Sequence, residues 1–276
     1  MHLRVRRGSK LIFHTARMFR FHMVPFYKLL QRIFNKLDEY DAKFTFPLVA
    51  SVARHHTELT EWIKSYPYEI AIHGYKHVRY NYLSTKQQLS EVKKAIQIFE
   101  ELKIPFRGFR APYNNYTPGT LEILEKFHFK WDGGIGFGPN YRNGHTFFRI
   151  TLKDGKNSSY ICIPLCEYSD DRMIDSYKFS SKQISKFLKY HLDKAQSVKG
   201  LVMFDLHPIR IGQKKYVQSL SELLDYAQKI NAWVPTVSEA VDYWLRNKHW
   251  KHNAPVCCIL TGDIDNFTFF DYIRRF

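Results

Sequence analysis

The chain has 276 residues, of which 45% are hydrophobic and 25% charged. This balance excludes a disordered chain, and the length suits a single α/β barrel with one large core. The formal net charge of +16 favours anionic partners such as acidic glycans or anionic lipid headgroups, although the lysines are scattered and suit a plain basic surface equally well. Nothing in this pattern indicates a specific nucleic-acid partner.

The first 24 residues are basic and aromatic without a clear period, and we treat residues 1–24 as an N-terminal arm. Their apolar run, Leu11-Ile12-Phe13, is too short for the core of a signal peptide. No stretch of the chain approaches the ~20 apolar residues of a membrane span. We therefore expect a cytoplasmic protein, with the arm as a candidate for amphipathic contact with a membrane surface.

Strand-like and helical segments alternate along residues 25–276. Helices are expected over about 26–37, 84–103, 117–127, 180–197, 214–229 and 237–246, and apolar strands over 43–50, 68–72, 106–110, 129–132, 160–164, 201–206 and 256–260, with a shorter one near Trp233. This alternation predicts a parallel sheet, and the length favours closure. The predicted fold class is α/β, a single distorted (β/α) barrel of seven or eight parallel strands.

Four cysteines occur, at Cys162, Cys166, Cys257 and Cys258, and none forms a zinc-type CxxC pair. They lie in or beside apolar runs. We expect buried free thiols in a reducing compartment.

Polar side chains follow several strands at the point where each strand ends. They are His73, His77, Arg110, Asp132, His207, Asp263 and Asp265. Strand ends of a parallel barrel converge on one face, so these groups are candidates for one pocket. Each also has an ordinary explanation: a surface or capping histidine, a surface ion pair for the arginine, a strand end before Pro208, and helix capping by the aspartates.

Taken together, these residue types suit metal-assisted hydrolysis. Two histidines and one carboxylate supply three metal ligands and leave a position for water. A second carboxylate can accept a proton from that water, and a further histidine can protonate a leaving group. The sequence therefore predicts hydrolysis of an amide or an ester.

Several segments resemble the polysaccharide deacetylases of the NodB-homology type (carbohydrate esterase family four), which share a distorted (β/α) barrel. EIAIHGYKH is similar to the H-x-x-x-H metal motif of the family. GFRAPY is similar to its Arg-Pro-Pro-Tyr motif, with Ala111 in the variable place, and FDLHP to the motif that carries its acid histidine. Residues 25–50 resemble the first helix and second strand.

The first strand of the family, which ends in Thr-Phe-Asp-Asp-Gly, has no counterpart before Pro25. VCCILTGDIDNFT near the C-terminus resembles it instead, with Asp-x-Asp in place of adjacent aspartates. A circular permutation that moved this strand to the end explains the order, and the resemblance then covers about residues 25–270. An alternative is that residues 256–276 begin a truncated second module.

The resemblance implies a metal centre in which His73, His77 and Asp265 hold a divalent ion, most simply Zn²⁺. It also implies that Asp263 deprotonates the attacking water, although strand alternation puts Asp263 and Asp265 on the same side and leaves their division of roles open.

The remaining roles follow from the same resemblance. His207 would protonate the departing amine, Arg110 would orient Asp263, and the backbone N–H of Tyr113 would stabilise the oxyanion. Asp132 is a candidate partner for His207, with Asp205 as its competitor.

The function implied is removal of N-acetyl groups from amino sugars of a glycan or a lipid-linked sugar. Two alternatives stay open. One is an allantoinase-like hydrolase acting on a small cyclic amide, and the other is an inactive basic barrel that binds an anionic polymer or membrane surface.

Overall fold

One parallel sheet organises the structure, a computed structural model that describes residues 15–135 and 145–274. Its strands within these ranges are β1 (Thr45–Leu48), β2 (Glu69–Ile72), β3 (Gly108–Phe109), β4 (Trp131–Asp132), β5 (Ile161–Cys162), β6 (Leu201–Asp205) and β7 (Cys257–Thr261). The strand order is β5-β4-β3-β2-β1-β7-β6, and every pairing is parallel.

Beyond β5 the chain curls back toward β6, the opposite edge strand of the sheet. Leu165 forms a parallel bridge with Met203 of β6, and the Cys166 N–H donates to the Met203 carbonyl at 2.8 Å. The predicted distorted (β/α) barrel is thus confirmed. The segment near Trp233, predicted as a strand, forms a single bridge to Cys257.

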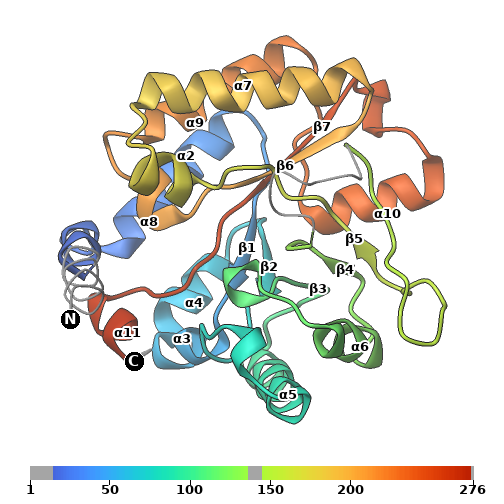
Figure 1. Ribbon diagram of the computed structural model, residues 1–276. Coiled ribbons are helices and arrows are strands. Elements are labelled where there is room, and N and C mark those ends of the chain that lie inside the picture. The colour runs from blue at the N-terminus through green and yellow to red at the C-terminus, as the bar shows by residue number, and fades with distance from the viewer. Residues whose placement is uncertain (1–14, 136–144, 275–276) are drawn as a thin grey trace, which may run out of the picture.

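Helices cover the outside of the sheet (Figure 1). They are α2 (Phe26–Glu39), α3 (Ala50–His55), α4 (Thr57–Lys64), α5 (Thr85–Glu101), α6 (Pro118–Lys126), α7 (Ser181–Ser197), α8 (Pro208–Ile211), α9 (Val217–Lys229), α10 (Val237–Asn247) and α11 (Phe269–Ile273). Residues 15–21 are also helical. Capping boxes begin α5 at Ser84, α6 at Thr117, α7 at Ser180 and α10 at Thr236, so these starts are set by local sequence.

The central strands are buried on both faces, as parallel strands under helices must be. Every residue of β6 and β7 is buried. The four cysteines are free and buried in this core, as predicted.

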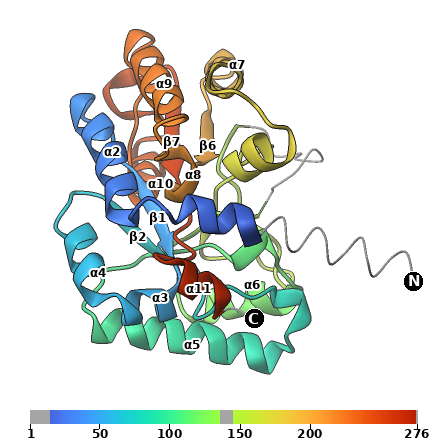
Figure 2. The same ribbon diagram turned by 90° about the vertical axis from the view of Figure 1, so that its left-hand side faces the viewer.

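The C-terminal strand β7 lies between β1 and β6. It pairs with β1 through Thr45 and Thr261, and with β6 over five residue pairs from Leu201–Cys257 to Asp205–Thr261. β7 therefore completes the same sheet and does not begin a separate one. The helical residues 15–21 and α11 lie side by side, which brings the two ends of the described chain together (Figure 2).

Two glycines allow the strand ends to approach closely. Gly74 adopts a φ of +76°, which side chains other than glycine rarely adopt. A Cβ at Gly262 would lie 2.0 Å from the carbonyl oxygen of Leu206. These positions place His73 and Asp263 at the carboxyl ends of β2 and β7.

Candidate metal centre and active site

Three side chains from opposite ends of the sequence meet at the carboxyl end of the sheet. Asp265 Oδ1 lies 3.5 Å from His73 Nε2 and 3.3 Å from His77 Nε2. The two histidines follow β2, and Asp265 follows β7 after Ile264 continues the sheet by a bridge to Leu48. The convergence predicted for these three residues is therefore present.

His73 is oriented by the backbone. Its Nδ1 lies 2.9 Å from the carbonyl oxygen of Arg110, which can only accept, so Nδ1 carries the hydrogen and Nε2 keeps its lone pair. The ring is fully buried, and Nε2 makes no hydrogen bond. Burial lowers the pKa of His73, but the charges of Asp263 and Asp265 outweigh it and the net shift is upward.

Asp263 lies between the histidines and a buried arginine. Arg110 Nη1 lies 2.8 Å from Asp263 Oδ1. The other carboxylate oxygen, Oδ2, lies 3.4 Å from His73 Nε2 and 4.0 Å from His207 Nε2. Asp263 is thus placed to exchange a proton with a group held between the two histidines.

Arg110 is fully buried, and each of its three guanidinium nitrogens donates a hydrogen bond. Its guanidinium donates to the Gly133 carbonyl at 2.9 Å, to Thr261 Oγ1 at 2.8 Å and to Asp205 Oδ1 at 3.2 Å, in addition to Asp263. Burial raises the pKa of Asp205 to about 7, against the opposing charges of His207 and Arg110. The arginine therefore compensates two buried carboxyl groups.

The partner of His207 is Asp170, not Asp132. His207 Nδ1 lies 2.7 Å from Asp170 Oδ1, whereas Asp205 Oδ1 is 3.8 Å away. Burial lowers the pKa of His207, but Asp205 and Asp170 outweigh it and hold this pKa well above its ordinary value. The acidic Ser169-Asp170-Asp171 segment after the apolar run 160–164 was the signal in the sequence that could have indicated Asp170.

The prediction for Asp132 as a partner of His207 is therefore wrong. Asp132 accepts a hydrogen bond from the Tyr116 hydroxyl at 2.6 Å and from the backbone N–H groups of Gly134 and Ile135, each at 3.2 Å. Burial raises its pKa to about 6. These bonds turn Asp132 toward the loop that follows β4 and make it a support for that loop.

Tyr113 lies beside His77, one of the two histidines of the candidate metal cluster. Its ring centroid is 4.2 Å from that of His77, and the Arg79 guanidinium lies 4.5 Å from the Tyr113 ring. The backbone of Tyr113 has a φ of 59°, and its side chain is 45% exposed. The predicted Arg-Ala-Pro-Tyr segment thus forms one wall of the site.

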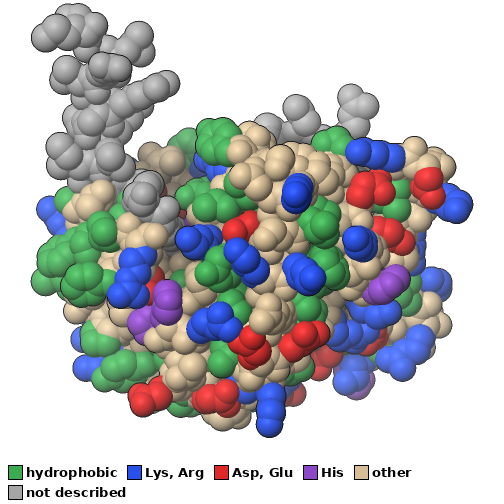
Figure 3. Space-filling view, turned by 90° about the horizontal axis from the view of Figure 1, so that it is seen from below, with side chains coloured by type: hydrophobic (Ala, Val, Ile, Leu, Met, Phe, Trp, Pro, Cys, Tyr) green, Lys and Arg blue, Asp and Glu red, His purple; other side chains and the backbone are tan. Residues whose placement is uncertain are grey.

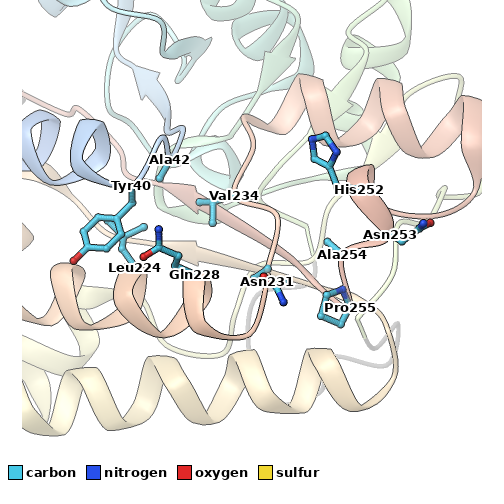
Figure 4. Close-up of a pocket in the computed structure, with 11 residues that line it drawn as sticks. Tyr40, Ala42, Leu224, Gln228, Asn231, Val234, His252, Asn253, Ala254 and Pro255 are labelled. Carbon is cyan, nitrogen blue, oxygen red and sulfur yellow. The ribbon is translucent and has the colours of Figure 1, made fainter.

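A pocket of about 280 Å³ opens beside the candidate metal cluster. Its lining includes the buried His77, the half-buried Asp265 and the exposed His55, Lys76 and Arg274. A second pocket, of about 470 Å³, lies at the opposite end of the strands, before β1 and β7 (Figure 4). Its lining residues include Tyr40, Gln228 and His252 but no acidic side chain.

The residues present fit a divalent metal. His73, His77 and Asp265 offer two imidazole nitrogens and one carboxylate oxygen, all within 4.8 Å of one another. This donor set is typical of catalytic zinc sites, and the buried Nε2 of His73 is an acceptor that no protein donor satisfies. The backbone bond to Nδ1 is the outer contact that such ligands commonly make.

Fold and site together define a distorted (β/α) barrel with a two-histidine, one-carboxylate cluster at the carboxyl end of its sheet. Residues 21–131 match the family model described as "Polysaccharide deacetylase". The resemblance to the polysaccharide deacetylases that the sequence predicted is therefore confirmed. Curated protein sequences give no match.

Solved structures share the fold at low sequence identity. An allantoinase named Puue is 18% identical with a TM-score of 0.72, over 87% of this chain and 78% of that one. A probable polysaccharide deacetylase from Pseudomonas aeruginosa PAO1 is 18% identical with a TM-score of 0.71, over 85% and 77%. A mutant of a CE4 family pseudoenzyme, BA3943, with restored enzymatic activity is 13% identical with a TM-score of 0.53, over 87% and 62%. Hydrolases and a pseudoenzyme thus share this barrel.

Proposed function

We propose that this protein is a metal-dependent hydrolase that removes N-acetyl groups from amino sugars of a glycan or a lipid-linked sugar. The observation that carries the proposal is the meeting of His73, His77 and Asp265 beside the Arg110–Asp263 pair and the Asp170–His207 pair. A divalent ion, expected to be Zn²⁺, would be held by the first three groups; when bound, it lowers the pKa of water and polarises a carbonyl.

Asp263 is the proposed base. Arg110 donates to Oδ1, which leaves Oδ2 to accept a proton from the attacking water. The water oxygen forms a bond to the acetamido carbon, and the carbonyl oxygen takes the negative charge. The backbone N–H of Tyr113 is the proposed donor to that oxygen.

His207 is the proposed acid. As the bond between the acetamido carbon and nitrogen breaks, Nε2 gives its proton to the departing amine, and the products are acetate and the free amino sugar. Asp170 holds Nδ1 and stabilises the positive ring before this transfer. The proposed acceptor, Asp263 Oδ2, and the proposed donor, His207 Nε2, lie 4.0 Å apart, so both can reach one reacting group.

Hydrolysis of a small cyclic amide is the second candidate, supported by the likeness to the allantoinase barrel. The same residues would act on either amide. We also propose the circular permutation, supported by the place of β7 between β1 and β6, and a cytoplasmic location, supported by four free cysteines.

Acetate release from N-acetylhexosamine oligomers tests the proposal, together with metal analysis of the purified protein. We expect about one divalent metal per chain, loss of activity on chelation, and recovery with added zinc. His77→Ala should lose metal and activity, while His249→Ala, an exposed histidine beside Trp250, should keep both. Full activity in chelator, or in His77→Ala, would overturn the metal mechanism. Release of ammonia or a ring-opened product from cyclic amides instead would favour the second candidate.

A further inference from the structure

Exposed apolar side chains are concentrated at one edge of the molecule. Among the described residues, six large hydrophobic side chains other than tyrosine are exposed, and four of these belong to residues 15–23 or to α11. The four are Phe19, Met23, Phe270 and Ile273, with 54%, 70%, 73% and 45% exposure. We call these four residues the terminal apolar surface. The other two, Val198 and Leu245, lie on separate elements.

The terminal apolar surface is continuous across the two segments. The Phe19 ring meets Phe269 edge-on at 5.3 Å, and His22 lies 6.4 Å from the same ring. The two helices lie against each other in both ribbon views (Figures 1 and 2). The view from below shows hydrophobic side chains gathered at its left edge, with Lys and Arg side chains around them (Figure 3).

Both segments are held against the barrel by their inner faces. The apolar side chains on their outer faces are therefore exposed on segments that are themselves held in place. Met18 is 4% exposed, and Arg17 pairs with Asp175 at 3.2 Å. In α11, both carboxylate oxygens of Asp271 lie within 3.0 Å of His56 Nε2. A fixed apolar surface of this kind on an otherwise charged protein marks a site of interaction.

The charge around this surface selects the partner. Residues 15–28 contain Arg17, Arg20 and Lys28 and no Asp or Glu. Arg20, Lys28 and Arg274 are exposed, whereas the acid of α11, Asp271, is 5% exposed and bonded to His56. Exposed aromatic and aliphatic side chains within a basic surround are typical of segments that lie in the interface of an anionic membrane.

The surface also adjoins the pocket beside the candidate metal cluster. Arg274 follows Ile273 directly, and it lines the 280 Å³ pocket together with Lys76, His77 and Asp265. None of Lys76, Arg274 and His55 forms an ion pair within the described ranges. A membrane seated on the terminal apolar surface would thus present its anionic headgroups to the pocket.

We propose that the terminal apolar surface docks the protein onto an anionic lipid membrane, together with the exposed basic residues Arg20, Lys28 and Arg274. The 280 Å³ pocket beside the candidate metal cluster would then face the headgroups. The partner is a lipid bilayer that carries phosphate headgroups. Docking itself does not depend on the proposed deacetylation. Its consequence, that the substrate is an amphiphile held in that membrane, rests on the proposed function.

Co-sedimentation with lipid vesicles tests docking in the absence of any substrate. We expect binding to vesicles of phosphatidylglycerol mixed with phosphatidylcholine, and much weaker binding to phosphatidylcholine alone. Met23→Glu combined with Phe270→Glu should weaken binding at least about tenfold, because two apolar side chains leave the interface. The matched control, Val198→Glu combined with Leu245→Glu, makes the same charge change elsewhere and should bind as the wild type does.

Two further measurements separate docking from folding and from catalysis. Both double variants should keep the far-ultraviolet circular dichroism of the wild type and its acetate release from soluble oligomers. Equal vesicle binding by Met23→Glu/Phe270→Glu and wild type would overturn the proposal. So would equal binding to neutral and anionic vesicles, or a dimer in solution that this variant alone abolishes, since the surface would then join two copies of the chain.

Discussion

Arg110 Nη1 lies 2.8 Å from Asp263 Oδ1, and neither side chain is more than 6% exposed. The pair joins the end of β3 to the end of β7, which are 153 residues apart in the chain. The same guanidinium also bonds Asp205, so one cation compensates two carboxyl groups in the core. Such a group is costly to remove, because the carboxylates left behind are buried without a counter-charge.

Arg110→Ala should therefore lower the free energy of unfolding by about 3–5 kcal/mol. Arg107→Ala is the matched control, since Arg107 pairs with Asp242 at a surface where the side chains are 43% and 38% exposed. Its loss should cost less than about 1 kcal/mol. Urea unfolding of both variants measures the two losses in free energy of unfolding. Equal losses would show that Arg110 is not a structural counter-ion.

Asp170→Asn should change the pH dependence of catalysis. The negative charge of Asp170 stabilises protonated His207, so its removal lowers the pKa of His207. An acid with a lower pKa loses its proton at lower pH, and the basic limb of the kcat profile should shift to lower pH. We also expect kcat at neutral pH to fall at least about tenfold.

Asp132→Asn is the control for that shift. Asp132 is also a buried acid near the site, but it bonds Tyr116 and two backbone N–H groups. Its variant should leave the basic limb where the wild type has it. A shift of the same size in Asp132→Asn and none in Asp170→Asn would reverse the assignment of the partner of His207.

Gly262→Ala should destabilise the β6–β7 pair. The added Cβ would meet the Leu206 carbonyl at 2.0 Å, and backbone must move to relieve the overlap. We expect a loss of about 2–3 kcal/mol in unfolding free energy and lower activity, because Asp263 and Asp265 follow this position. Gly155→Ala, at a φ of +81° with nothing within 4 Å, should cost only about 1 kcal/mol. Thermal unfolding and acetate release distinguish the two.

The contact between Asp271 and His56 should stabilise the protein except at low pH. Burial raises the pKa of Asp271, but bonds from His56 and Thr268 outweigh it and lower this pKa from 3.8 to about 2. A carboxyl group with a lowered pKa contributes stability above its unfolded pKa and loses it as pH falls through the folded value. The contribution is about 2 kcal/mol near neutral pH.

Asp271→Asn should therefore be less stable than wild type at pH 6, and the difference should shrink between about pH 4 and pH 2. Chemical denaturation across this range measures it. Asp41→Asn, whose side chain is 96% exposed, should show no such difference. If the free energies of unfolding of wild type and Asp271→Asn differed by a constant amount down to pH 2, the stabilising role of the Asp271 carboxylate would be contradicted.

Much of the fold was predictable because its signals are local. Ser84, Thr117 and Ser180 begin helices through capping boxes that span four residues each. The apolar segments predicted to end at Ile72 and Leu260 become strands within one residue of those ends. The α3 helix was missed because its six residues are too few to show a helical period.

The site was predictable wherever a functional side chain directly follows a strand. His73, Arg110 and Asp263 follow β2, β3 and β7, and parallel strands end on a common face. Asp170 was not assigned because it lies five positions after Leu165, the residue that bridges to β6. The orientation of the Asp170 side chain depends on the turn into the π-helical segment Arg172–Ser176, and no periodicity in the sequence predicts this turn.

The sequence by itself determined the parallel barrel, the chemical types at the strand ends and the resemblance that links them, since these follow from periodicity and short-range spacing. Only the tertiary structure decided that Asp170, not Asp132, bonds His207, and that Phe19 lies against Phe269. The first relation depends on the return of the chain after β5 to β6, where Leu165 bridges Met203, and the second depends on how β7 enters the sheet between β1 and β6. That long-range pairing brings Asp265 within 3.3 Å of His77.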